Sequence, residues 1–363
     1  MGISRAGGMI AVALLLGVPF LAAAVLSVPQ PAGTRFWVDL AAGMLVLAMA
    51  VSPIWLPSEA IPLLRHDRLG TFAAILVAVA SIAARPDGAL VSKHLTLGGL
   101  LLAVLSANPL LTDAALALAV SAALAPRIGA GWYRVPLAGA GLGLLLFGSI
   151  LPSAPFASGC ALLGLATLAV AAPVLLPILP LLALRHAGPE LVALGLVSVV
   201  GCGVGLLLWP SPRSYVPWIA LGQAGVVGAV FGLQSPDATF VGLVLAMLLV
   251  LSQAARALAA GEGLTPLLSS AGLGGLPPFG VFPGLALAIA AVAKQAPWLL
   301  LALLPGLAAL GWASIVRLPA PRIAASDRWS LAWIPLAAAA LIGWFLPGPV
   351  AAWLHALATE PFG

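Results

Sequence analysis

Charged side chains are the residues of this chain that could do chemistry, because they form only 7% of its 363 residues while 63% are hydrophobic. A charge inside a bilayer is costly, so it is retained where it moves a proton or an ion. Three charged residues beside long apolar stretches are candidates for an ion pathway: Asp113, Arg256 and Lys294. These stretches contain no carboxylate pair, metal-ligand cluster or nucleophile with a base. We therefore expect no catalytic site in this chain.

Each of these three residues also has an interpretation that needs no ion transport. Asp113 could cap the start of a helix over 110–126. Arg256 could extend its charge to the interface at the end of a span, with Glu262 as counter-ion. Because arginine keeps its proton near neutral pH, it could bias a proton path without relaying protons. Lys294 could anchor the end of a span. Both interpretations stay open for each residue.

Three histidines that follow basic residues are expected in loops, either solvated or in contact with lipid headgroups. They are His66, His94 and His186, which follow Arg65, Lys93 and Arg185. They are far apart in sequence and lack the spacing of a metal site, so no metal is expected in this chain.

The elements that position these residues are apolar stretches, which make the chain a polytopic membrane protein. A span needs about 20 apolar residues, and roughly thirteen stretches qualify: 8–28, 36–56, 69–84, 92–107, 110–126, 135–152, 157–184, 189–209, 215–233, 238–260, 264–293, 297–317 and 329–347. The net charge of +5 comes from basic residues scattered at span ends. Such residues are typical of topology anchors, so no nucleic acid partner is expected.

One of these stretches, 264–293, is expected to be a broken helix. It contains Gly274, Gly275, Pro277, Pro278, Gly280 and Pro283. Proline removes an amide donor and clashes with the preceding helical turn. Since freed backbone groups in hydrocarbon need partners, we expect the break to be buried in a bundle, with its carbonyls near Asn108, Gln223 or ordered water.

The segment 270–282, SAGLGGLPPFGVF, resembles a motif of one family of membrane subunits. It is similar to the "S-L-A-G-L-P-P-x-x-G-F" break of the antiporter-like subunits of respiratory complex I, membrane-bound hydrogenases, formate hydrogenlyases and Mrp antiporters. Five further segments resemble other motifs of this family, in the same order: 105–111, 164–173, 187–189, 218–225 and 252–258. The resemblance implies an all-α polytopic fold of about 12–14 transmembrane helices, including the broken one.

The resemblance also places the family's proton-conducting residues on this chain, where most of the positions are apolar. The positions are Ala117 for a glutamate of the fifth helix, Leu168 and Val200 for lysines of the seventh and eighth, and Gly284 for a lysine after the break. The family's histidine aligns with Gln223, which is therefore a fourth candidate for the ion pathway. Asp113, one helical turn before the glutamate position, could replace that glutamate. The resemblance thus implies a degenerate, scaffold-like subunit without the full proton-conducting charge set.

We expect one integral membrane domain over 1–363, with N-terminal helices over 1–90 and a first antiporter-like half over 91–210. A second half with the broken helix follows over 211–320, then a C-terminal helix and tail over 321–363. The expected function is a membrane-arm subunit of a complex I-like or hydrogenase-like assembly, redox-linked or ion-translocating, in the bacterial inner membrane.

The expected partners are other membrane subunits, peripheral redox or catalytic subunits, and lipid. Iron–sulfur, metal or quinone cofactors would lie on those partners and none on this chain. The alternative is a stand-alone secondary transporter for a small solute or ion, because broken helices also form substrate sites in transporters.

Overall fold

The structure is a computed structural model that describes residues 2–52, 64, 67–83, 90–125, 134–150, 164–165, 189–208, 215–259, 264–278, 280–316 and 331–359. In these ranges the regular elements are helices, and an isolated β-bridge joins Leu64 and Ser106. The all-α fold predicted from the sequence is therefore confirmed for the described part. The chain forms two compact units, Met1–Ile178 and Leu179–Gly363.

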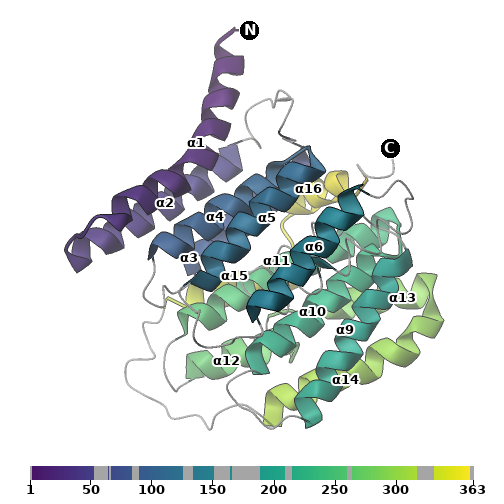
Figure 1. Ribbon diagram of the computed structural model, residues 1–363. Helices are drawn as coiled ribbons and strands as arrows, with labels where there is room; N and C mark the ends of the chain where they lie inside the picture. The colour runs from purple at the N-terminus through teal and green to yellow at the C-terminus, as the bar shows by residue number, and fades with distance from the viewer. Residues whose placement is uncertain are drawn as a thin grey trace. The chain divides into compact units, whose positions relative to one another are not determined.

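The first unit is built around α4. Its described helices are α1 (Gly2–Ser27), α2 (Ala32–Val51), α3 (Arg68–Ala83), α4 (Leu90–Leu105), α5 (Pro109–Leu124) and α6 (Arg134–Ile150). Helix α4 packs against α1, α3 and α5, and Figure 1 shows α3, α4 and α5 side by side. Leu97, Leu101 and Leu105 repeat every four residues along α4 and are almost fully enclosed. A Cβ at Gly99 would lie 2.8 Å from the backbone nitrogen of Ala119 in α5, so these two helices are in main-chain contact.

The second unit is built around α11. Its described helices are α9 (Pro189–Leu208), α10 (Tyr215–Phe231), α11 (Pro236–Leu258), α12 (Leu264–Leu273), α13 (Phe282–Gln295), the 3₁₀ helix η5 (Pro297–Leu299), α14 (Leu300–Val316), α15 (Trp333–Trp344) and α16 (Gly348–Thr359). Helix α11 packs against α10, α12, α13, α15 and α16. Of its apolar stretch 78% is buried. A helix on the outside of a bundle buries only one stripe, so α11 is the core helix of this unit.

Small residues hold α9 between α10 and α14. A Cβ at Gly195 would overlap the carbonyl oxygen of Gly225 in α10. One at Gly203 would lie 3.1 Å from the carbonyl oxygen of Gly306 in α14. Such close approach of main chains is typical of helix packing in membranes, where small residues take the place of a hydrophobic driving force.

Four described stretches are long and apolar enough to cross a membrane: Ala32–Val51, Glu190–Leu208, Pro236–Leu258 and Pro297–Val316. Helices α15 and α16 pass the same test as a pair and are bent by 74° at their junction. The shorter apolar helices are 10–17 residues long. The chain is an integral, multi-pass membrane protein.

The stretches predicted to be spans coincide with described helices, except that 157–184 lies outside the described residues apart from Gly164 and Leu165. At the C-terminal end the structure adds α16, over residues that the sequence analysis assigns to a tail. Pro347 lies between α15 and α16 and cannot continue α15, which explains why the chain starts a second helix there. The internal boundaries proposed for the single domain stay predictions.

Candidate functional site

The predicted interruption of the stretch 264–293 is confirmed. Helix α12 ends at Leu273 and α13 begins at Phe282. Between them Gly275 has φ 80° and Gly280 has φ 65°. Glycine adopts this left-handed region without steric cost, whereas residues with a Cβ are strained there. Two glycines therefore set the two corners of the break.

Main-chain hydrogen bonds close the end of α12. The Leu276 amide donates to the Ala271 carbonyl at 3.0 Å, and the Gly275 amide donates to the Gly272 carbonyl at 3.2 Å. This pair of bonds, with Gly275 in the left-handed conformation, is a Schellman motif. The amide of Val281 also donates to the Gly272 carbonyl, at 3.0 Å. The Gly272 carbonyl thus joins the end of α12 to the start of α13.

The carbonyl of Pro278 takes its hydrogen bond from a different helix. The indole Nε1 of Trp344 in α15 donates to this oxygen at 2.8 Å. The oxygens of Ala271, Gly272 and Pro278 thus accept from backbone amides and an indole rather than from Asn108 or Gln223. The tight turn at Gly275 places backbone amides beside the oxygens of Ala271 and Gly272. The indole of Trp344 reaches the oxygen of Pro278.

The break is buried only in part. Gly274 and Gly280 are buried, but Pro277 and Pro278 are exposed, so the expectation of complete burial is wrong. The prolines have no amide hydrogen to satisfy, which makes their turn tolerable at the surface of the unit. Pro283 is buried at the start of α13, a position where the missing amide costs little.

Close packing explains why glycines occupy the buried positions of the break. A Cβ at Gly280 would overlap the carbonyl of Gly272, and one at Gly274 would overlap the hydroxyl of Ser314 in α14. A Cβ at Gly343 of α15 would lie 2.8 Å from the ring of Pro283. The break is therefore fixed against α14 and α15.

Gln223 places a polar side chain beside the break. It lies in α10 and is 0% exposed, and neither its amide nitrogen nor its amide oxygen has a hydrogen-bond partner among the described residues. Its Nε2 lies 3.4 Å from the position that a Cβ at Gly275 would take. The hydroxyl of Ser270 in α12 is also buried, with no partner in the described ranges. These atoms form the polar side of the core near the break. Each unsatisfied group lowers the free energy of unfolding by about 1–3 kcal/mol.

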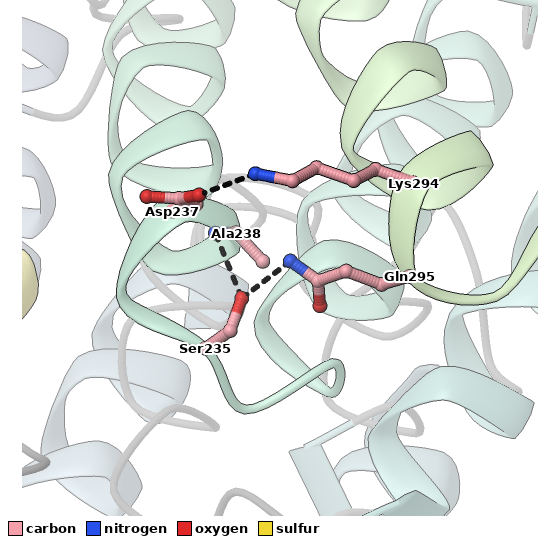
Figure 2. A network of polar contacts seen from close by, with 5 residues as sticks. All are labelled: Ser235, Asp237, Ala238, Lys294 and Gln295. Carbon is pink, nitrogen blue, oxygen red and sulfur yellow. Dashed lines mark hydrogen bonds and ion pairs between the residues drawn. The ribbon is translucent and has the colours of Figure 1, made fainter.

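Lys294 lies at the far end of α13 from the break and is paired with an aspartate. Its Nζ is 3.1 Å from Oδ2 of Asp237 at the start of α11, and the two side chains are 73% and 63% exposed. Next to this pair, Gln295 donates to the hydroxyl of Ser235 at 2.5 Å, and that hydroxyl caps α11 by accepting from the Ala238 amide at 3.2 Å. Figure 2 shows the two contacts side by side. They join the end of α13 to the start of α11.

Arg256 lies in the last turn of α11, at the opposite end from Asp237. Its Nη1 is 3.4 Å from the carbonyl oxygen of Ala259, which follows the helix. A guanidinium at a helix C-terminus interacts favourably with the last carbonyls. The contact is compatible with an arginine at the end of a span. Glu262, its expected counter-ion, lies outside the described residues.

Asp113 lies in α5 of the first unit and is half-buried. The cap of this helix is Asn108, whose side chain accepts from the Leu110 amide at 2.9 Å. The interpretation of Asp113 as the cap is therefore wrong, because the side chain that reaches the free amides precedes Pro109 rather than following it.

The structure does not gather the candidate ion-pathway residues of the second unit into one site. Gln223 lies at the break, Lys294 lies at the other end of α13, about 18 Å along the helix axis, and Arg256 ends α11. Their places in the ion pathway stay predictions.

A charged cluster that the sequence analysis missed lies in the first unit. Nζ of Lys93 is 2.9 Å from Oδ2 of Asp39, and Nε2 of His94 is 3.0 Å from Oδ1 of the same carboxylate. Asp39 belongs to α2, and the two nitrogen-bearing residues belong to α4. Their side chains are 16%, 11% and 1% exposed in the order Asp39, Lys93, His94.

The expectation that His94 lies in a loop is wrong. It lies in the second turn of α4 and is buried, inside the apolar stretch 92–107 that predicts this helix. The signal that could have revealed the cluster is Asp39, a carboxylate inside the apolar stretch 36–56. Such a residue needs a partner.

No model of a known protein family matches the sequence, and no curated protein matches it. Solved structures match the fold. A chain of respiratory complex I from Thermus thermophilus is 17% identical with a TM-score of 0.67, covering 96% of this chain and 98% of that chain. A chain of the membrane-bound sulfane sulfur reductase, an archaeal respiratory membrane complex, is 14% identical with a TM-score of 0.70, covering 97% of both chains. A chain of the Mrp complex from Dietzia sp. is 13% identical with a TM-score of 0.72, covering 96% of this chain and 52% of that one.

These likenesses establish the class of fold. The chain has the antiporter-like membrane-subunit fold, as the sequence motifs predict.

Proposed function

We propose that this chain is a membrane-arm subunit of a complex I-like or hydrogenase-like assembly that is redox-linked or translocates ions. The observation that supports the proposal is the likeness in fold, over 96–97% of the chain, to chains of three multisubunit membrane complexes. In this proposal the partners are other membrane subunits and peripheral redox or catalytic subunits, surrounded by lipid. Iron–sulfur, metal or quinone cofactors belong to those partners, and the membrane is a bacterial inner membrane.

We further propose that the subunit is degenerate as a proton conductor. Val200, at a lysine position of the family, is 36% exposed on α9. Gly284 is buried, and a Cβ there would lie 2.8 Å from the side chain of Leu245 in α11, so a longer side chain would have to displace this leucine. Ala117 is half-buried and Leu168 lies outside the described residues. The described family positions thus offer no titratable group.

Purification from native membranes through an affinity tag tests the proposal. We expect the chain to co-purify with other membrane subunits and with soluble redox or catalytic subunits. A lone monomer or homodimer that carries a solute into liposomes would show that it is a secondary transporter instead.

A further inference from the structure

We propose that two helix breaks of the second unit, at 274–281 and 345–347, form a docking surface for a transmembrane helix of another membrane subunit. The helix that fits this surface is apolar and carries a hydrogen-bond donor, such as a hydroxyl, amide or indole group, at the middle of the bilayer. That the helix comes from a subunit of the same assembly rests on the proposed function. The need for a donor at this surface follows from this chain alone.

The two breaks lie side by side. The first is the turn between α12 and α13, and the second is the bend of 74° between α15 and α16. The indole of Trp344 donates to the carbonyl of Pro278 at 2.8 Å, and a Cβ at Gly343 would lie 2.8 Å from the ring of Pro283. One surface of the unit therefore contains the interruptions of two apolar helical stretches.

Helix α11 gives the depth of this surface in the membrane. It has 23 residues, with Asp237 in its first turn and Arg256 in its last turn. At 1.5 Å per residue it is about 35 Å long, slightly longer than the hydrocarbon thickness of about 30 Å. A Cβ at Gly343 would lie 3.6 Å from the side chain of Leu248, beside the middle of α11, and one at Gly284 would lie 3.1 Å from the same side chain. Both breaks are therefore near the middle of the bilayer.

Backbone carbonyls at this surface lack donors. The carbonyl oxygens of Pro277 and of Ile342, Gly343 and Trp344, at the end of α15, accept from no donor among the described residues. Pro347 has no amide hydrogen that could reach back to α15. The carbonyls at the end of a helix bind water where they are solvated, but hydrocarbon offers them no donor. The surface therefore needs a donor from outside the described part of the chain.

The side chains around these carbonyls favour protein as the neighbour. Irregular backbone at this depth is found where it is buried in protein or lines a water-filled cavity, and not against lipid. Phe345 is 77% exposed, Trp344 is 53% exposed, and Pro277 and Pro278 are exposed. A water-filled cavity needs polar walls, whereas exposed aromatic side chains are typical of protein interfaces. A transmembrane helix with a donor side chain satisfies both the apolar and the polar parts of this surface.

An exposed position on an unbroken helix provides the matched control. Val197 is 70% exposed near the middle of the stretch Glu190–Leu208 in α9. The backbone of an unbroken helix makes its hydrogen bonds within the helix, so lipid is a sufficient neighbour at this position.

Spin labels in the purified assembly test what covers the surface. The two native cysteines, Cys160 and Cys202, are replaced by alanine, and a nitroxide is attached at Phe345→Cys or Val197→Cys in the assembly in nanodiscs. Oxygen reports contact with lipid, and a water-soluble nickel chelate reports contact with water. We expect the label at Phe345→Cys to lose contact with both reagents, and the label at Val197→Cys to be reached by oxygen. Strong contact of Phe345→Cys with oxygen overturns the proposal in favour of lipid, and strong contact with the nickel chelate overturns it in favour of a water-filled cavity.

Photo-cross-linking in the same assembly identifies the occupant. Phe345 is replaced by benzoyl-phenylalanine, the purified assembly is irradiated, and the cross-linked peptides are mapped by mass spectrometry. The same replacement of Val197 is the control, for which lipid is the expected neighbour. We expect Phe345 to be cross-linked to an apolar helix of another subunit, with a donor side chain within one helical turn of the linked residue. A cross-link confined to this chain, or one to a second copy of it, overturns this occupant.

The two experiments also separate the docking surface from the proposed function. A chain that joins no assembly overturns the proposed function and this occupant together. An assembly in which Phe345 faces lipid overturns the docking surface alone.

Discussion

Trp344 and Pro278, 66 residues apart, are joined by a hydrogen bond of 2.8 Å from the indole nitrogen to the proline carbonyl. This bond holds α15 against the turn between α12 and α13. Trp344→Phe keeps the aromatic contact with Phe282, whose ring centroid is 6.2 Å away, and removes the donor. We expect a loss of about 0.5–1.5 kcal/mol in the free energy of unfolding, the usual net contribution of one hydrogen bond.

The measurement for Trp344→Phe is thermal unfolding of the purified protein in detergent. Trp298→Phe is the matched control, because Trp298 is 69% exposed. Equal effects of the two variants would show that the hydrogen bond contributes nothing beyond the loss of an indole.

Gly280→Ala is expected to be strongly destabilising. A Cβ at this residue would overlap the carbonyl of Gly272, and its φ of 65° is unfavourable for alanine. Strain of this kind costs about 1–3 kcal/mol before the overlap is counted. The yield of folded protein in membranes, measured by fluorescence-detected gel filtration, should fall sharply. Gly348→Ala, where a Cβ meets nothing within 4 Å, should leave the yield unchanged.

Gln223→Met tests whether the buried amide needs its polarity. Both polar atoms of Gln223 are without partners among the described residues, so an apolar side chain of similar shape should leave the free energy of unfolding unchanged or raise it by about 1 kcal/mol. Gln295→Met is the comparison, because it removes an amide that is bonded to Ser235, and it should lower stability slightly. A large loss with Gln223→Met would indicate that its amide is hydrogen-bonded in the membrane-embedded protein.

Lys294→Gln is expected to have little effect on stability. The ion pair with Asp237 is mostly exposed, and such pairs contribute about 0.2–1 kcal/mol. A double-mutant cycle with Asp237→Asn, run at low and high salt, should give a coupling in this range that shrinks as salt is added. Proton translocation by the assembled complex should be unaffected. A loss of translocation would show that Lys294 handles ions.

Asp113→Asn and Arg256→Gln should alter folding or assembly more than ion flux. The reason is that the described family positions carry no titratable groups, so a continuous path through these two residues is not expected. Assembly yield and proton translocation per complex are measured for both variants. Normal assembly with translocation abolished by either change would mean that the subunit is not degenerate as a proton conductor.

The sequence predicted the helices well because their signal is local. Apolar runs of span length and the helix-breaking residues from Gly274 to Pro283 determine helix and break without reference to the rest of the fold. The hydrogen-bond partners of the break depend on tertiary contact. No local pattern could place Trp344 beside Pro278 or show that Gly272 would accept from Val281.

The charged cluster was missed for a related reason. Asp39 inside an apolar stretch needs a partner, but Lys93 is 54 residues away and nothing local in the sequence identifies it as that partner. His94 follows a lysine, which favoured a loop, but it lies within α4 and its imidazole faces Asp39 of α2. Only the pairing of α2 with α4 shows that the three side chains share one site.

The Gly272 carbonyl has a mechanical consequence. A helix flexes at a place where its hydrogen bonds are missing, yet this oxygen accepts from both Gly275 and Val281, one on each side of the gap. Straightening or further bending of the segment would break both hydrogen bonds. The close contact between Gly280 and the carbonyl of Gly272 also opposes movement of one chain segment along the other. We expect the amides of Leu276 and Val281 to exchange with deuterium as slowly as those inside α13. Such slow exchange would show that the two half-helices move together as one bent unit.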